Sequence, residues 1–181
     1  MGSHDGRQRL VLQALALGMA GGMRSWPPLA MLMLTHDVAP PGSGWKRWPV
    51  LKTAGGRRAL IALGVIEPVA DKWPGTIPRV QVKPQLSHTD GGIVGRVAVD
   101  TLAGAVLGSE YSRKNSIALA AVVSGVSALI GNYVAMALRN AVVKSTKLPD
   151  PTVGSIEDVI CYTVLTGVAH SRGARILPAR G

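Results

Sequence analysis

Long apolar stretches, separated by short loops rich in proline, glycine and basic residues, set the pattern of this chain. A helix needs about 20 residues to cross the hydrocarbon of a bilayer. Five stretches approach that length, namely 10–34, 57–73, 91–108, 117–143 and 153–169. The first and fourth satisfy a strict hydropathy criterion, whereas the other three need protein neighbours to shield them. The pattern predicts one all-α membrane domain over 1–181, an integral membrane helical bundle of about five short spans.

Small residues recur at every fourth position in several of these stretches. Ala14, Gly18 and Gly22 share one helix face in the first stretch, and Gly104 and Gly108 share one in the third. Such faces let helix backbones approach closely in lipid, where packing drives association. They predict a compact bundle, and together with the short helices they predict a homo-oligomer.

The pattern G-x-I-E-x-V occurs twice, at 64–69 and at 154–159. Each copy follows a longer, glycine-rich apolar stretch and a proline-containing loop. The first two spans would then correspond to the last two, with one span between them. This arrangement predicts an inverted-topology repeat, which many transporters use with the binding site at the repeat interface. The two copies share four of six residues, so chance agreement is the competing explanation.

The composition supports a membrane protein over a nucleic-acid-binding one. Hydrophobic residues make up 47% of the chain and charged residues 17%, against about 25% charged in a typical soluble domain. The formal charge is +10, but the stretch 117–138 carries no charge and the basic residues lie mainly between the apolar stretches. With five spans the basic loop residues divide almost evenly between the two sides. The charge bias that sets orientation is therefore weak, and we expect the N-terminus outside.

The sharpest candidate site surrounds Glu67 and Asp71, which are four residues apart and therefore share a helix face. Pro68 lacks an N–H and leaves the carbonyl of Gly64 without its helical partner. A carboxylate beside such a carbonyl is a candidate site for a hard cation or a proton. Asp71 could equally be interfacial, and Lys72 is expected at the membrane interface.

Arg24 lies within the first apolar stretch, just before Pro27 and Pro28. A buried arginine there needs a partner or a water-filled cavity, and we expect Glu67 or Glu157 as that partner. A structural ion pair and an anion site are both open at this point.

Glu157 and Asp158 are expected in the first turn of the fifth helix, with Ser155 as its cap. That placement is structural by default, and the repeat alone adds an ion-binding role. Arg96 and Asp100, four apart in the third span, are expected to neutralise each other. Asn132 in the fourth span is expected to form a hydrogen bond between helices.

Motifs of enzymes and cofactor sites are not recognisable. The histidines do not form a metal-ligand pattern, the run G-G-I-V-G at 91–95 lacks the lysine of a phosphate loop, and no nucleophile–base arrangement stands out. The single cysteine, Cys161, excludes an internal disulfide framework. We therefore expect no metal, no cofactor and no enzymatic activity.

Several segments resemble one bacterial family of multi-pass membrane proteins, which is defined as a domain of unknown function. Its signatures G-x-R-S, E-x-x-A-D-K-x-P and E-D correspond to 22–25, 67–74 and 157–158 here, and the resemblance covers roughly 10–169. It implies a multi-pass protein of the bacterial inner membrane, and it implies no activity. The recurring charged residues of the family match Arg24, Glu67, Asp71, Lys72, Arg79, Glu157 and Asp158.

Two functions follow from these observations. The first is a small cation- or proton-coupled transporter or channel, in which Glu67 and Asp71 bind the ion, Arg24 controls their protonation and Glu157 is the repeat-related partner. The alternative is a non-transporting membrane scaffold or lipid-interacting protein, in which the charges form structural pairs and the basic loops contact anionic head groups. The expected partners are the lipid bilayer, a small ion and further copies of the chain, and not nucleic acid.

Overall fold

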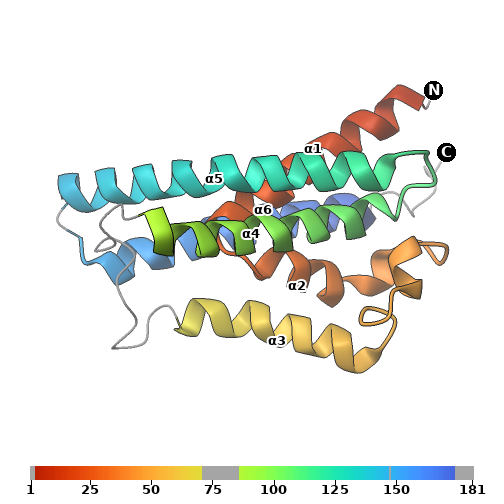
Figure 1. Ribbon diagram of the computed structural model, residues 1–181, viewed down its shortest axis with the longest axis horizontal. Coiled ribbons are helices and arrows are strands. Elements are labelled where there is room, and N and C mark those ends of the chain that lie inside the picture. Colours follow the sequence, from red (N-terminus) through yellow and green to blue (C-terminus); the bar gives the residue numbers. More distant parts are fainter. Residues whose placement is uncertain (1–2, 71–85, 147, 174–181) are drawn as a thin grey trace.

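The computed structural model describes residues 3–70, 86–146 and 148–173, and in this part of the chain every regular element is helical (Figure 1). The α-helices are α1 (Ser3–Met23), α2 (Pro27–Leu34), α3 (Ala54–Ala70), α4 (Leu86–Gly108), α5 (Ser116–Thr146) and α6 (Asp150–Gly173). Two short 3-10 turns, η1 (His36–Val38) and η2 (Gly44–Arg47), lie between α2 and α3. The predicted all-α class is therefore confirmed.

We predicted that the apolar stretch 10–34 forms one span, and this prediction was wrong. The stretch forms two helices with a reversal between them. Arg9, near the start of α1, donates to the carbonyl of Ser171, and Thr35, at the end of α2, accepts from Arg172 Nη1 at 2.6 Å. The beginning of α1 and the end of α2 therefore both lie beside the end of α6. Two consecutive prolines explain the break between the helices, because they cannot continue α1 but occupy the first positions of α2 without losing a helical bond.

The reversal gives the bundle two ends, which we name by what they contain. The loop end holds the segments 35–53 and 109–115, and the break end holds the α1–α2 reversal at Arg24. Helices α1, α3 and α5 run from the loop end to the break end, and α2, α4 and α6 run back (Figure 1). The first and last described helices thus have their outer ends at the same end of the bundle. Five successive spans would have placed them at opposite ends.

The small-residue faces pack as expected. A Cβ atom added at Gly18 would lie 2.1 Å from the carbonyl oxygen of Ser124, and one at Gly22 would lie 2.4 Å from the backbone nitrogen of Asn132. A Cβ atom at Gly104 would lie 2.3 Å from the carbonyl oxygen of Ala120. Helices α1 and α4 therefore contact α5 backbone to backbone, which only glycine permits at these positions.

The inverted repeat lacks support in this arrangement. Contacts from α1 to α5 advance in the same direction along both helices, from Gly18–Ser124 to Gly22–Asn132, so these helices are parallel. The helices that carry the two G-x-I-E-x-V copies, α3 and α6, run in opposite directions (Figure 1). An inverted repeat relates its two halves by one two-fold axis in the membrane plane. That axis would make α1 antiparallel to α5 as well as α3 antiparallel to α6.

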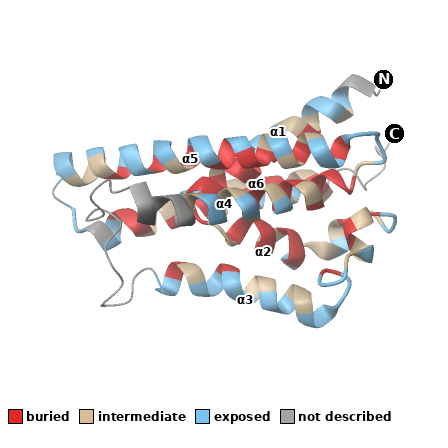
Figure 2. Cartoon of the chain, in the orientation of Figure 1, coloured by how far each residue is buried: buried red, intermediate tan, exposed pale blue. Residues whose placement is uncertain are grey.

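The outer surface of the bundle is strongly apolar, and Figure 2 shows that its exposed positions follow the outer faces of the helices. Helix α5 alone exposes Val122, Val126, Ile130, Tyr133, Met136 and Leu138, each more than half exposed. Among the described helices, those over Ser116–Thr146 and Pro151–Gly173 are long and apolar enough to cross a membrane. A bundle of five such spans is not supported, because α1 begins with charged residues and α3 has 17 residues.

Candidate functional site

The break end holds a buried charge cluster centred on Arg24, the first residue after α1. Its side chain is fully buried, its Nε donates to Asp158 Oδ1 at 2.5 Å, and its Nη2 lies 3.5 Å from the carbonyl of Gly154. We expected Glu67 or Glu157 as the partner, and both expectations were wrong. The two acids of α6 are adjacent, and neighbouring residues on a helix point about 100° apart.

Glu67, on the last turns of α3, binds the backbone of the reversal and not Arg24. Its two carboxylate oxygens accept hydrogen bonds from the backbone N–H groups of Ser25, at 3.0 Å, and Trp26, at 2.9 Å. Because Pro27 and Pro28 have no N–H, these are the donors that the start of α2 presents. Glu67 therefore caps α2 from another helix, and its negative charge suits the positive end of the helix dipole.

The carbonyl of Gly64, which Pro68 leaves without a helical partner, is not available as a ligand. The hydroxyl of Tyr162 on α6 donates a hydrogen bond to it at 2.9 Å. This bond ties α3 to α6 and satisfies the oxygen that the sequence indicated as part of a cation site.

Glu157 pairs with Arg139 of α5, whose Nη1 lies 3.1 Å from Glu157 Oε2, and both side chains are largely buried. The expected first-turn position of Glu157 and Asp158 was wrong, because α6 begins at Asp150. Ser155 is not the cap of α6, since its hydroxyl donates to the carbonyl of Pro151 within the helix.

Asp100 of α4 differs from the other acids of the cluster. It is fully buried, and neither carboxylate oxygen has a hydrogen-bond partner among the described residues. Its carboxyl group lies against the backbone of Gly21, where an added Cβ atom would be 1.8 Å from Oδ1. The expected pair with Arg96 does not form, because Arg96 Nη1 donates to the carbonyls of Gly22 and Met23 at the end of α1.

A hollow of about 460 Å³ lies over α6 beside this cluster, lined by Asp158, Val159, Tyr162, Thr163 and Thr166. It leads from the outer surface to the carboxyl group that holds Arg24. Its lining is mainly apolar, and the hydroxyl groups of Thr163 and Thr166 donate to the backbone carbonyls of Val159 and Tyr162 within α6.

Three expected site residues, Asp71, Lys72 and Arg79, lie outside the described residues. Asn132 is described, but its side chain makes no hydrogen bond within the described part of the chain, and it meets Gly22 of α1 through its backbone. No group of three or more His, Cys, Asp or Glu side chains among the described residues could hold a metal ion.

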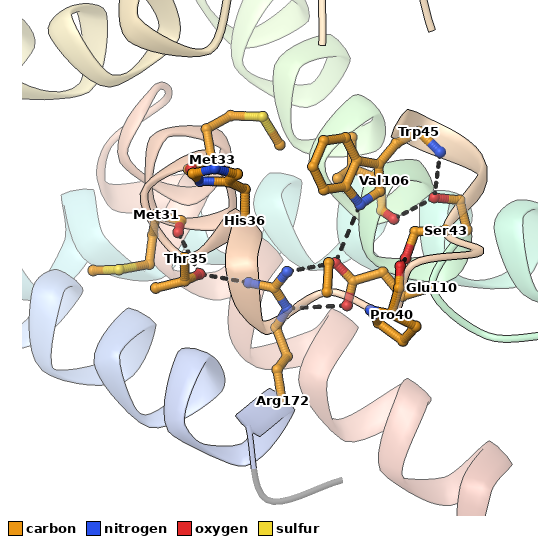
Figure 3. Close-up of polar contacts among 12 residues, drawn as sticks. Met31, Met33, Thr35, His36, Pro40, Ser43, Trp45, Val106, Glu110 and Arg172 are labelled. Atoms are coloured by element: carbon orange, nitrogen blue, oxygen red, sulfur yellow. Dashed lines mark hydrogen bonds and ion pairs between the residues drawn. The ribbon is translucent and has the colours of Figure 1, made fainter. Parts of the chain in front are cut away.

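A second buried charge cluster, at the loop end, was missed entirely by the sequence reasoning (Figure 3). The guanidinium of Arg172 donates to both carboxylate oxygens of Glu110, with Nε 3.1 Å from Oε2. The side chains of Arg172 and Glu110 are 1% and 0% exposed. Arg172 also donates to Thr35, and the indole of Trp45 donates to Glu110 at 3.4 Å.

This pair joins four parts of the chain at one point: the end of α6, the α4–α5 turn, the end of α2 and η2. In the sequence, Glu110 lies between the apolar stretches 91–108 and 117–143, and Arg172 lies after the stretch 153–169. The sequence offered one signal for such a pair, because each residue lies within a few residues of the end of an apolar stretch. No sequence pattern connected the two residues, which are 62 positions apart.

Comparison with protein-family models, curated proteins and solved structures finds no match for the chain. The resemblance to the bacterial membrane family therefore stays a prediction.

Proposed function

We propose that this chain is a multi-pass integral membrane protein of the bacterial inner membrane that moves a proton or a small cation through the break end of the bundle. The observation that carries the proposal is the fully buried Asp100 carboxyl, which has no hydrogen-bond partner in the described part of the chain. An ionised carboxylate in such a place is costly unless a proton or a cation joins it. An ionisable residue of this kind is the usual mark of an ion pathway.

The apolar exterior supports the membrane part of the proposal. The bundle buries arginines and acids in its interior and exposes large aliphatic side chains, the reverse of the charge distribution of a soluble domain. Helices α5 and α6 supply the two clear spans. The shorter α3 and the charged α4 would cross while shielded by their neighbours.

The sequence-based hypothesis assigned cation binding to Glu67 and Asp71, and we now assign it to Asp100. Asp100 takes the place of Asp71 as the principal carboxyl group, and Glu67 holds the reversal next to it. Arg24 would stay paired with Asp158, and the nearby Arg96 would stay bonded to the carbonyls of Gly22 and Met23 at the end of α1. Glu157, already paired with Arg139, takes no part.

The test is flux in proteoliposomes, comparing the natural chain with Asp100→Asn over a panel of monovalent cations and pH gradients. We expect the substitution to lower the flux at least about tenfold, because a neutral amide cannot take up and release a proton. Asp37→Asn, which makes the same change at a side chain that is 90% exposed, is the matched control and should retain the flux. No flux from the folded natural chain, or an unchanged flux in Asp100→Asn, would show that the proposal is wrong.

A non-transporting scaffold is the second candidate, and the saturated pairs favour it. Arg24–Asp158, Arg139–Glu157 and Arg172–Glu110 each hold helices together, as structural ion pairs would. A scaffold would show no flux in any variant, and neutralising either member of a pair would cause misassembly.

From the distribution of the basic residues we propose an orientation opposite to the one expected from five spans, which placed the N-terminus outside. Among the described residues, the loop end carries Arg9, Lys46, Arg47, Lys52, Arg57, Arg58, Arg113 and Lys114, whereas the break end of α5 carries Arg139 and Lys144. Lys72, Arg79, Lys83 and Lys147 lie outside the described residues. Basic loops stay in the cytoplasm, so the loop end and the outer ends of α1 and α6 would face it. Single cysteines at Lys114 and Ser145, in a Cys161→Ser chain, test this. An impermeant thiol reagent added outside intact cells should label the second and not the first.

A further inference from the structure

A small basic cavity lies at the loop end, far along the bundle from Asp100. Its volume is about 250 Å³, below the roughly 300–1,000 Å³ of pockets that hold drug-sized ligands. The connection between α2 and α3 and the first turn of α3 enclose it. The lining residues are His36, Trp45, Lys46, Lys52 and Arg57.

Three cations of this cavity have no acid to neutralise them. Lys46 donates to the carbonyl of Ala39 at 3.0 Å, and Arg57 Nη1 donates to the carbonyls of Leu51 at 3.0 Å and Lys52 at 3.1 Å. Lys52 has no acceptor, and no carboxylate lies within 4 Å of any of the three cations in the described part of the chain. The remaining N–H groups are therefore available to an anion.

Of the described acids near this cavity, Glu110 is paired with Arg172 and Asp37 is turned toward solvent. Asp37 Oδ1 lies 3.2 Å from His36 Nε2, but the Asp37 side chain is 90% exposed. The other nitrogen of His36, Nδ1, lies 3.0 Å from the carbonyl of Met33. His36, which lines the cavity, is thus held in place by its bond to the end of α2 (Figure 3).

Trp45 makes one wall of this cavity rigid. It is 1% exposed, its backbone N–H donates to Ser109 Oγ at 3.1 Å, and its indole N–H donates to Glu110. Lys46 Nζ lies 5.7 Å from the centre of the Trp45 ring. The cavity wall is therefore fixed by the loop-end charge cluster, whereas the lysine and arginine side chains can close on a ligand.

We propose that this cavity binds a phosphate group. Phosphate is a compact anion with several acceptor oxygens, which suits two ammonium groups and the free side of a guanidinium around a small cavity. The group could belong to the head group of an anionic phospholipid, since the loop end carries exposed cations that suit a membrane interface, or to a phosphate free in solution. This site is separate from Asp100 and does not depend on transport.

The experiment uses the full chain, purified in a zwitterionic detergent. Native mass spectrometry counts bound phosphatidylglycerol against diacylglycerol, which has no phosphate, and a melting assay compares inorganic phosphate with chloride at equal ionic strength. The pocket variant is Lys46→Gln/Lys52→Gln. The matched control, Arg113→Gln/Lys114→Gln, removes the same charge from exposed positions at the same end of the bundle.

We expect binding to be at least about tenfold weaker in the pocket variant than in the control, with Lys46→Arg/Lys52→Arg retaining it. Binding of the lipid alone identifies the source as a head group, and stabilisation by inorganic phosphate identifies it as a free anion. An equal loss of binding in the pocket and control variants would mean diffuse attraction to the charged surface. If neither phosphatidylglycerol nor inorganic phosphate were preferred over its comparator, the cavity would not be a phosphate site. Either result overturns the proposal.

Discussion

Two buried charge clusters occupy opposite ends of the bundle, and they are built on different principles. At the loop end, Arg172 and Glu110 form a bidentate pair that Thr35 and Trp45 complete. At the break end, Arg24 has Asp158 and Glu67 has two backbone N–H groups, but Asp100 has no hydrogen-bond partner among the described residues. Both regions are buried, so the difference lies in how far their polar groups are hydrogen-bonded.

That difference separates a structural role from a functional one. A fully satisfied buried network makes a structure rigid, whereas an unsatisfied buried acid is a cost that a protein keeps when the site has a use. The loop end would thus fix the bundle, while the break end would hold a carboxyl group ready for a proton or a cation. Four substitutions test this contrast.

The largest effect is expected at the loop end, from Arg172→Met. The change leaves the Glu110 carboxylate buried without its cation, and breaking a buried pair in this way costs about 3–5 kcal/mol. The melting temperature and the monodisperse fraction in mild detergent should both fall. Arg113→Met, which removes an exposed cation from the same end, is the control. Equal behaviour of the two variants would contradict a structural role for the pair.

A smaller cost is expected from Gly21→Ala, which tests the packing around Asp100. The new methyl would lie 1.8 Å from Asp100 Oδ1, so the carboxyl group must move, and overpacking of this kind costs about 1–3 kcal/mol. Gly95→Ala is the control, because a Cβ atom there meets nothing within 4 Å and alanine favours the helix. Thermal unfolding in detergent should separate them. If both variants melt alike, Asp100 does not lie against α1 as described.

Glu67→Gln should destabilise the protein by about 1–2 kcal/mol, in the range measured for lost helix caps. The amide keeps one acceptor oxygen and places a donor group against the second N–H, so either Ser25 or Trp26 loses its bond. Chemical unfolding in mixed micelles measures the change. An unaltered midpoint would show that Glu67 does not cap α2.

The smallest effect on stability, less than about 1 kcal/mol, is expected from Asp100→Asn. No hydrogen bond is lost, and a neutral amide costs less to bury than a carboxylate. A folded, stable variant without flux would sharpen the contrast between the two ends. A large loss of stability would instead place Asp100 with the structural residues.

The helices themselves were largely predictable from the sequence. The stretch 117–143 became α5 over Ser116–Thr146, and 91–108 falls within α4. Both are local consequences of apolar residues without internal proline. The small residues at Gly18, Gly22 and Gly104 also indicated close packing correctly, because the size of a side chain limits how near two backbones come.

The boundaries that depend on tertiary contacts were not predictable in the same way. Pro27 and Pro28 signalled a break, but a kinked span and a full reversal have the same local sequence. The choice between them rests on the packing of α2 against α3 and on the bonds from Glu67 to the reversal. The start of α6 was similarly placed too late, because Asp150 and Pro151 read as loop residues although both suit a helix start.

By itself, the sequence determined that this protein is helical, that its helices pack through glycine and alanine, and that charges lie inside apolar segments. These properties follow from the chemistry of each residue and its near neighbours. Only the tertiary structure decided that Arg24 meets Asp158 and not Glu157, that Arg172 meets Glu110, and that Asp100 meets no hydrogen-bonding group among the described residues. Partner choice depends on how each helix is rotated about its axis, and that rotation is set by packing against all of its neighbours at once.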